Sequence, residues 1–188
     1  MKLREENLET IIETPPFNLE KFSLIYENDS NQPNHPFYRL RAKDWINVVP
    51  ITKEGQVVLI EQPRAGPLCN TLEIPGGVVD AGEQPEAAVI RELEEETGYK
   101  AQTIEKLGAI NPNPAFMTNT LHVYIAKGCS IAKNRQRYPD ASERIELKLF
   151  PLTEISEIVR SNRVGSALAA LGLLWAEPTI RDLAKENG

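Results

Sequence analysis

One segment constrains this chain more than any other, because it joins a clearly bounded helix to a dense run of glutamates. Pro85 suits the first helical position, where its missing N–H would have no partner, and Gly98 suits the left-handed residue just past a helix end. These two residues predict a helix over 85–97. Four of the five residues from Glu92 to Glu96 are glutamates. A solvated acidic helix face is the ordinary explanation for such a run.

Three of these glutamates are expected to share one face of the helix. At 100° per residue, Glu92, Glu95 and Glu96 fall within an arc of about 100°. Their like charges repel at these spacings, and the helix dipole disfavours acids near a C-terminal end. A divalent cation would remove this penalty, since carboxylates on a rigid element suit Mg²⁺ or Mn²⁺. The glycines upstream would let the Gly76 carbonyl join the metal ligands.

The net charge of the chain comes entirely from this segment. The 188 residues carry 21 bases and 27 acids, which gives −6, and residues 77–99 alone hold seven acids and one base, also −6. Without a basic cluster, nucleic acid is not an expected partner. The N-terminus has no signal-peptide pattern and no apolar run is long enough to cross a bilayer, so no membrane association is expected. We expect a cytoplasmic protein whose Cys69 and Cys129 are reduced.

The remaining sequence predicts strands and helices in a mixed order. Strands are expected at 20–27, 37–41, 45–51, 56–62, 120–128 and 144–152, and further helices at 154–162 and 166–177. This order favours the α/β class, with a mixed sheet between helices. Residues 1–44 are predicted to form a small N-terminal antiparallel β subdomain, and residues 45–188 the catalytic domain.

Residues 77–99 resemble the Nudix box, G-x5-E-x7-R-E-U-x-E-E-x-G-U with U bulky and apolar, at every fixed position. The resemblance implies the Nudix fold, an α/β/α sandwich, and hydrolysis of a nucleoside diphosphate linked to another moiety. It implies that three glutamates ligate the metals with help from the Gly76 carbonyl, and that Glu83 and Arg91 orient and support them. The matching residues are Gly77, Glu83, Arg91, Glu92, Leu93, Glu95, Glu96, Gly98 and Tyr99.

The segment ahead of the box, EQPRAGPLCNTLEIPGG, resembles that of ADP-ribose and nucleotide-sugar pyrophosphatases. By that resemblance Arg64 would contact a substrate phosphate, for which its planar fork is suited, and Glu73 would lie beside the metals. Pro114 lies 15 residues after Tyr99, the spacing of a marker proline in ADP-ribose pyrophosphatases. Those enzymes usually place glycine next, whereas this chain has Ala115, so the predicted substrates extend to other nucleotide sugars such as GDP-mannose.

The same resemblance implies a catalytic glutamate on a loop before a late strand. Alignment backwards from Phe150 favours Glu143 as the base, with Asp140 and Glu146 as alternatives. Glu146 falls within the strand expected at 144–152, so it is interpreted as a solvent-facing strand residue instead.

The resemblance also implies a homodimer built through the N-terminal part, whose two subunits would share each site. Trp45 is the residue best suited to stack on the nucleotide base, and Arg41 is counted with it among the substrate-binding residues. A core tryptophan at the start of a strand is an equally open reading of Trp45.

These features predict a hydrolase, dependent on Mg²⁺ or Mn²⁺, that cleaves nucleoside diphosphate sugars to a nucleoside monophosphate and a sugar phosphate. One alternative substrate class is dinucleoside polyphosphates or RNA 5′ ends, although RNA calls for a basic, stacking surface that the sequence does not indicate. Another alternative is a non-catalytic nucleotide-sugar sensor. Such regulators append a DNA-binding winged helix, and only 38 residues follow Phe150.

Overall fold

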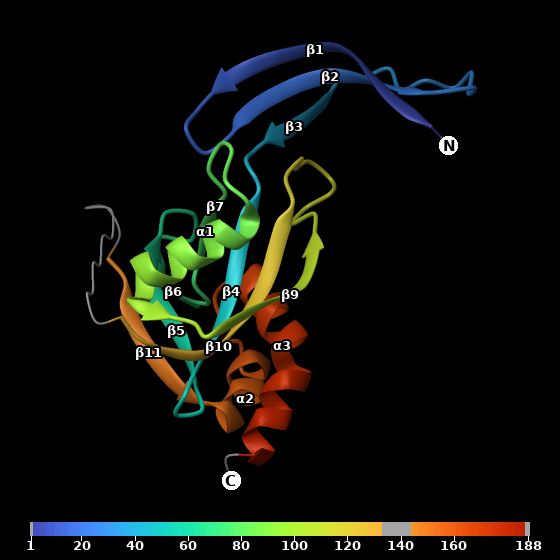
Figure 1. Cartoon of the computed structure of the whole chain (residues 1–188). Coiled ribbons are helices and arrows are strands. Elements are labelled where there is room, and N and C mark those ends of the chain that lie inside the picture. The colour runs from blue at the N-terminus through green and yellow to red at the C-terminus, as the bar shows by residue number, and fades with distance from the viewer. Residues whose placement is uncertain (1, 133–143, 187–188) are drawn as a thin grey trace. The chain divides into compact units, whose positions relative to one another are not determined.

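The computed structural model describes residues 2–132 and 144–186. The chain divides into two compact units (Figure 1). One contains the residues up to Asp44 together with Ile110–Thr120, and the other contains Trp45–Ala109 and the residues from Leu121 onward. The segment 110–120 therefore groups with the N-terminal part, although it follows the glutamate-rich helix in sequence.

The first unit is built on an antiparallel sheet of three strands. These are β1 (Leu3–Glu13), β2 (Asn18–Tyr26) and β3 (Phe37–Arg41), in the order β1-β2-β3. The loop segment 110–120 bonds to the last of them, since the Leu40 amide donates to the Phe116 carbonyl at 2.7 Å and the Thr118 amide donates to the Leu40 carbonyl at 3.2 Å. The sequence predicted β2 and β3 but not β1.

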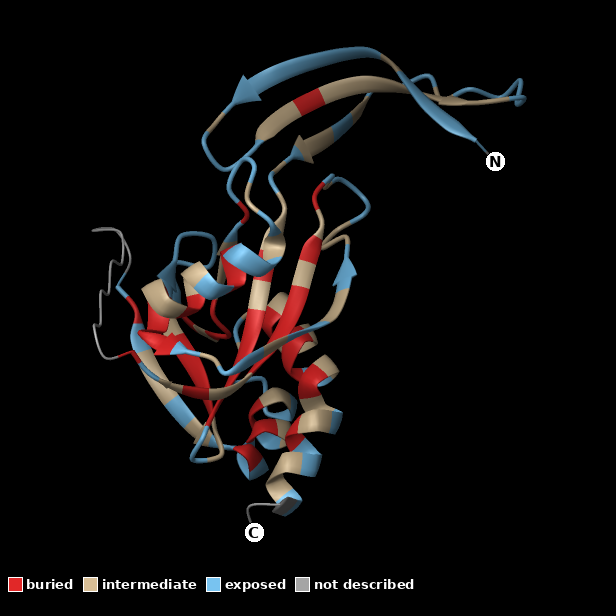
Figure 2. Cartoon of the chain, in the orientation of Figure 1, coloured by how far each residue is buried: buried red, intermediate tan, exposed pale blue. Residues whose placement is uncertain are grey.

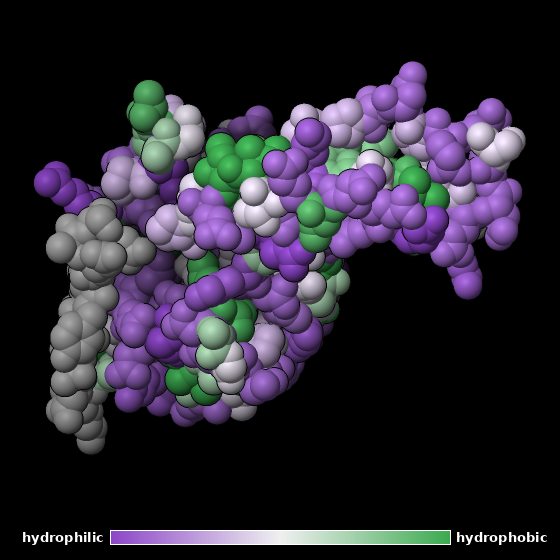
Figure 3. Space-filling model, turned by 90° about the horizontal axis from the view of Figure 1, so that it is seen from above, coloured by the Kyte–Doolittle hydropathy of each residue, from purple (hydrophilic) through white to green (hydrophobic). Residues whose placement is uncertain are grey.

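Strand β1 was missed because almost every one of its residues is exposed. A strand that buries neither face carries no alternation of apolar and polar residues, which is the signal that sequence reading uses. Its large apolar side chains lie at the surface, including Leu3, Leu8, Ile11 and Ile12. Figure 3 shows a mostly hydrophilic surface in which apolar patches stand out in green.

The second unit is built on a mixed sheet, as predicted. The strand order is β11-β5-β4-β10-β8, with β6 on β5, β7 on β4 and β9 on β10. β4 pairs in parallel with β10, and antiparallel with β5 and β7. The predicted hairpin between β4 and β5 is confirmed. The bounds are β4 (Trp45–Thr52), β5 (Gln56–Arg64), β6 (Cys69–Glu73), β7 (Gly76–Val78), β8 (Tyr99–Lys100), β9 (Thr103–Ile110), β10 (Leu121–Ile131) and β11 (Glu146–Pro151).

Helices cover both faces of this sheet, so its central strands are buried on both sides (Figures 1 and 2). Along β4, Ile46 and Val48 face the helix α1 (Pro85–Glu92), whereas Val49 and Ile51 face the opposite layer. That layer contains η2 (Leu152–Glu154), α2 (Ile155–Arg160) and α3 (Ala167–Glu186). The α/β/α sandwich expected from the sequence is therefore present. Among the described residues, no helix is long and apolar enough to cross a membrane.

Helix α3 is longer than predicted. The expected helix ends at Glu177, before Pro178, because proline removes a backbone donor and obstructs a helix interior. In the structure α3 continues through Pro178 to Glu186. Ile180 lies beyond the proline and is buried in the core cluster with Ala176 and Leu173. Burial of this face outweighs the local cost of the proline.

Candidate active site

The glutamate-rich segment forms a helix whose last turn differs from the first two. α1 begins at Pro85, after an extended Gln84, and its buried Ala88 and Val89 fix it to the sheet. From Leu93 to Thr97 the chain forms a π-helical segment, η1. The predicted helix is therefore α-helical only to Glu92, and the 100° spacing assumed for the three glutamates does not extend through the wider turn.

Gly98 ends this helix as predicted. Its φ is 73°, in the left-handed region, and its amide donates to the Glu94 carbonyl at 2.8 Å. Glycine reaches this backbone conformation without the steric cost that a side chain would add. The turn brings Tyr99 into β8, where its side chain is buried beneath the helix with Leu93.

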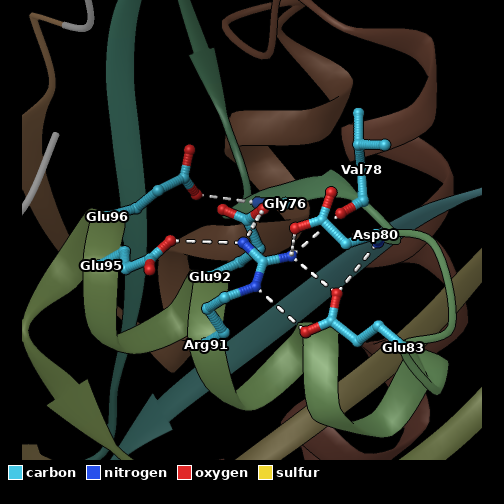
Figure 4. A network of polar contacts seen from close by, with 8 residues as sticks. All are labelled: Gly76, Val78, Asp80, Glu83, Arg91, Glu92, Glu95 and Glu96. Carbon is cyan, nitrogen blue, oxygen red and sulfur yellow. Dashed lines mark hydrogen bonds and ion pairs between the residues drawn. The ribbon is translucent and has the colours of Figure 1, made fainter. Parts of the chain in front are cut away.

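Gly76 and Gly77 of β7 let the acidic side chains approach the backbone closely, and Figure 4 shows the contact of Gly76 with Glu96. The Gly76 amide donates to Glu96 Oε2 at 2.9 Å, and Glu96 is only 5% exposed. A Cβ at Gly77 would overlap the carboxylate of Glu92, and one at Gly76 would overlap the Ile46 carbonyl. Glycine at both positions is thus a steric requirement of the arrangement.

Arg91 lies at the centre of the carboxylates (Figure 4). Its Nε and Nη2 donate to the two oxygens of Glu83 at 3.1 and 2.9 Å, and Nη2 also donates to the Val78 carbonyl at 3.0 Å. On its other side, Nη1 donates to Glu92 Oε1 at 2.7 Å and to Glu95 Oε2 at 3.3 Å. One guanidinium therefore ties the loop before α1 to the last two turns of the helix.

The same contacts determine the charges of this network. The hydrogen bonds that Arg91 donates to Glu83, and then to Glu92, raise the pKa of Arg91 above its ordinary value. The hydrogen bonds from Arg91 in turn lower the pKa of Glu83, and the Asp80 amide, which donates to Glu83 Oε2 at 3.0 Å, acts in the same direction. Glu83 and Arg91 are consequently an ionised pair at neutral pH.

The chemistry of this donor set fits a hard divalent cation. Glu92, Glu95 and Glu96 offer carboxylate oxygens from one rigid helix, beside a glycine backbone that approaches closely. Among the described residues no three acidic, histidine or cysteine side chains already converge on one point. The reason is that Glu96 bonds to Gly76, while Glu92 and Glu95 bond to Arg91. Binding by all three would require these side chains to exchange partners.

A pocket of about 470 Å³ opens beside the two glycines. It brings together residues of the box, the segment upstream of it and the start of α3. Five of the residues that the sequence singled out line it, which are Trp45, Arg64, Glu73, Gly76 and Gly77. The remaining lining residues are Ile46, Asn47, Pro67, Val78, Ser166 and Leu168.

Arg64 and Glu73 form a bidentate pair in this pocket. Arg64 Nε donates to Glu73 Oε1 at 2.8 Å and Nη2 donates to Oε2 at 2.9 Å. The Thr71 hydroxyl adds a third hydrogen bond, to Glu73 Oε1 at 2.5 Å. Burial alone would raise the pKa of Glu73, but the hydrogen bonds from Arg64 and Thr71 outweigh it, and the pKa is lowered. Glu73 is thus a buried, ionised carboxylate whose oxygens are both engaged.

Two predicted substrate-binding residues belong to the first unit. Arg41 bonds through Nε to Glu20, a buried carboxylate that also accepts from Arg39 Nε at 2.7 Å. Pro114 lies in the turn that the Met117 amide closes by donating to the Asn113 carbonyl at 2.8 Å. Their predicted roles remain predictions.

The candidates for the catalytic base fall mostly outside the described residues. Both Glu143 and Asp140 do so. Glu146 begins β11, is exposed, and accepts from Lys148 Nζ at 3.0 Å. That position agrees with a solvent-facing strand residue.

Sequence reading did not single out three residues of this region. Asn47 and Ser166 line the pocket, and Thr71 bonds to Glu73. Ser166 carried a usable signal, because a serine directly before an apolar helical run is a common N-cap. Its hydroxyl does accept from the Ala169 amide, at 3.4 Å. Nothing local distinguishes Asn47 or Thr71, since their contacts depend on how strands pair.

Comparison with known proteins agrees with this geometry. A family model for the NUDIX domain matches residues 43–168. An ADP-ribose pyrophosphatase of Bacillus subtilis (strain 168) is 33% identical over 157 residues, which cover 81% of this chain and 84% of that protein. An ADP-sugar pyrophosphatase of Mus musculus is 39% identical over 89 residues, which cover 44% of this chain and 40% of that protein.

Two further similarities extend the comparison. A methanol dehydrogenase activator of Bacillus methanolicus is 34% identical over 132 residues, which cover 70% of this chain and 71% of that protein. The crystal structure of an ADP compounds hydrolase matches with a TM-score of 0.81 at 22% identity, covering 100% of this chain and 97% of that one. At this identity the structural match establishes a shared fold.

Proposed function

The chain belongs to the NUDIX domain family and is a hydrolase of phosphorus anhydrides, and from this premise we propose that its substrates are nucleoside diphosphate sugars. The reaction would cleave the pyrophosphate linkage with water and release a nucleoside monophosphate and a sugar phosphate. The reaction consumes one water molecule and needs no other reactant.

One observation carries the proposal. The glycines that contact the glutamate-rich helix line the same pocket as an arginine, a type of side chain that binds phosphate. Gly76 and Gly77, which contact Glu96 and Glu92, line the same pocket as Arg64. A diphosphate needs positive charge and bidentate donors, and arginine supplies both. A pocket of about 470 Å³ is in the size range of small-molecule sites.

We assign the acidic helix to Mg²⁺ or Mn²⁺ binding, through Glu92, Glu95, Glu96 and the Gly76 carbonyl. When bound, such an ion would neutralise the charge of the diphosphate and polarise its phosphorus–oxygen bonds. Arg91 and Glu83 would hold the helix and the loop before it in register. Three observations support these assignments: the carboxylate chemistry of the site, the lack of room for a side chain at Gly76 and Gly77, and the bond from Arg91 to Glu83.

We assign the remaining roles to residues around the pocket. Arg64 would bind a phosphate, and Trp45 would stack against the nucleotide base. Glu143 would accept the proton of the attacking water, with Asp140 as the alternative. Arg41 and Pro114 are likewise proposed as substrate-binding residues.

The relatives support the choice of nucleotide sugars. An ADP-ribose pyrophosphatase and an ADP-sugar pyrophosphatase are among the proteins similar to this chain. Ala115, where ADP-ribose pyrophosphatases usually have glycine, leads us to include GDP-mannose and similar compounds among the substrates.

We further propose a homodimer formed through the N-terminal sheet. β1 is an edge strand of 11 residues that exposes Leu3, Leu8, Ile11 and Ile12. Long exposed edge strands with apolar side chains readily pair with another chain. Light scattering coupled to size exclusion would test this proposal, with Ile11→Lys/Ile12→Lys expected to yield monomers.

The test of activity is phosphate release, after coupling to a phosphatase, with Mg²⁺, with Mn²⁺ and with chelator. The panel would contain ADP-ribose, GDP-mannose, UDP-glucose, diadenosine polyphosphates and a 5′-triphosphorylated RNA. Metal-dependent turnover confined to the diphosphate sugars is the expected result. Turnover of only the polyphosphates or the RNA would contradict the proposed substrate class, and silence on the whole panel would favour a sensor.

A further inference from the structure

We propose that Thr71 and Glu73 are positioning residues that hold Arg64 ready for a substrate phosphate, and that the connection between α2 and α3 fixes Thr71. This inference rests on the proposed function, because it gives Arg64 a phosphate to bind. It assigns Glu73 to the arginine rather than to the predicted place beside the metals.

Strand pairing brings the three side chains to one face. In the antiparallel pair of β5 and β6, Gln62 lies opposite Thr71 and Arg64 lies opposite Cys69. Opposed residues point to the same side, and so do residues two apart along a strand. Arg64, Thr71 and Glu73 therefore share a face, and the long arginine side chain reaches along the sheet to the carboxylate.

The pair is buried at one end and exposed at the other. The side chain of Glu73 is 9% exposed, whereas that of Arg64 is 46% exposed and borders the pocket. The contact uses the Nε and Nη2 side of the guanidinium. A flexible arginine would lose rotamer freedom on binding a phosphate, which weakens binding. Because Glu73 already holds Arg64 in the free protein, less freedom is lost when the phosphate binds.

Thr71 completes the arrangement because the Glu73 carboxylate must itself be held in one orientation to position Arg64. The Thr71 hydroxyl donates to Glu73 Oε1, the oxygen that also accepts from Arg64 Nε. Thr71 is 7% exposed, so water does not readily replace this donor. Removal of the hydroxyl would leave the carboxylate with two partners on one side only and free it to rotate.

The connection between α2 and α3 packs against Thr71 and Leu72 of β6. The Gly165 amide donates to the Leu72 carbonyl at 3.0 Å, and Val164 forms a bridge with Leu72. A Cβ at Gly165 would lie 2.7 Å from both Cβ and Cγ2 of Thr71. The glycine backbone thus packs directly against the threonine methyl, which restricts its rotamer and directs the hydroxyl towards Glu73.

The experiment compares Thr71→Val, which removes the hydroxyl at nearly constant volume, with Thr71→Ser, which retains it. Each is made in the wild-type and in the Arg64→Lys background. Two quantities are measured on the intact protein: the Kd of inorganic pyrophosphate by calorimetry without divalent cations, and kcat and KM for ADP-ribose with Mg²⁺. Thermal unfolding of every variant is followed in parallel.

We expect Thr71→Val to raise the Kd and the KM roughly fivefold, the effect of one hydrogen bond, with kcat changed by less than about twofold. Thr71→Ser is expected to restore both constants. In the Arg64→Lys background, Thr71→Val is expected to have no further effect, because the fork that it helps to position is gone. Gly165→Ala is expected to reproduce the Thr71→Val phenotype.

Three results would overturn the inference. A lower Kd in Thr71→Val would mean that Glu73 competes with phosphate for Arg64. An equal loss in both backgrounds would mean that Thr71 acts independently of Arg64. A loss that Thr71→Ser does not restore would mark a packing effect. Failure of the proposed function is distinguishable, since wild-type protein would then turn over no nucleotide sugar while the pyrophosphate titrations still report on Arg64.

Discussion

The backbone amide of Gly76 donates to Glu96 Oε2 at 2.9 Å, which joins strand β7 directly to the last turn of the acidic helix. The bond holds a buried carboxylate next to the two glycines that line the pocket. This backbone donor therefore helps to fix where the acidic end of the helix meets the pocket.

Glu96→Gln separates the structural and metal-binding roles of this side chain. The glutamine oxygen can still accept from Gly76, so we expect the melting temperature without metal to change little. Turnover with Mg²⁺ should fall by about 10²-fold or more, because a neutral amide is a poor replacement for a carboxylate ligand. Initial rates over a range of Mg²⁺ concentrations measure the effect. Glu94→Gln is the control, since Glu94 lies on the same turn but pairs with Lys100, and it should retain activity.

Gly77→Ala tests the close approach of Glu92. The new methyl group would displace the end of a flexible side chain, so we expect the fold to persist and the turnover to fall by about 10²-fold through misplacement of that carboxylate. Gly66→Ala is the matched control, because nothing lies within 4 Å of the added atom. Equal activity in the two variants would contradict a functional role for the Gly77 contact.

Trp45→Ala should raise the KM for a nucleotide sugar by roughly tenfold or more, because stacking of a base on an aromatic ring contributes about 1–3 kcal/mol. The KM of Trp45→Phe should fall between those of Trp45→Ala and the wild type. Trp175, which lies on α3, packs against Gly108 of β9 and serves as the control. Its replacement by phenylalanine should lower the melting temperature and leave KM unchanged. A Trp45→Ala variant with normal KM would assign this residue to the core.

Substitution at three acids identifies the catalytic base. We expect Glu143→Gln to lower kcat by about 10²–10⁴-fold, the contribution of a general base. Asp140→Asn and Glu146→Gln should retain most of the activity, the latter because Glu146 is exposed and pairs with Lys148. Steady-state kinetics with saturating Mg²⁺ distinguish the three. A large loss in Asp140→Asn alone would transfer the role to that residue.

Glu20 makes the N-terminal sheet sensitive to acid. Burial would raise the pKa of this carboxyl, but the hydrogen bonds from Arg41 and Arg39 lower it below 4.5. Its contribution to stability is therefore present above about pH 4.5 and is lost as the pH falls through the lowered folded-state value. We expect Glu20→Gln to reduce the free energy of unfolding by about 1–3 kcal/mol at pH 7.

Urea denaturation at several pH values measures this effect. The difference between wild type and Glu20→Gln should shrink as the pH falls below 4.5. Glu9→Gln, at a side chain that is 66% exposed, should differ little from wild type at any pH. A difference for Glu20→Gln that stays constant down to pH 3 would show that its ionisation is not what stabilises the sheet.

The parts of the fold that sequence predicts well are those set by local chemistry. Pro85 and Gly98 mark the two ends of the acidic helix, and the apolar run from Trp45 to Ile51 predicts a strand buried on both faces. Where an element depends on distant contacts, prediction fails. The burial of Ile180 carries α3 past Pro178, and the exposed β1 gives no periodic signal.

The candidate site divides in the same way. The acidic residues and Arg64 follow from a motif at fixed spacing, so they could be named from sequence. The contact of Thr71 with Glu73 depends on which residues face one another across β5 and β6, and the wider turn from Leu93 to Thr97 depends on packing of Leu93 and Thr97 in the interior. Neither is encoded in a short stretch of chain.

The first unit is discontinuous, and this has a consequence for biosynthesis. Leu40 bonds to Thr118, 78 residues later, and Asp44 accepts from the Thr120 amide. At a translation rate of roughly 5–20 residues per second, the ribosome adds Thr118 about 4–16 s after Leu40. The three strands of the N-terminal sheet are thus made first, but the unit that contains them is complete only after the whole acidic helix has been synthesised. Until then the exposed edge of the sheet is present without the segment 110–120.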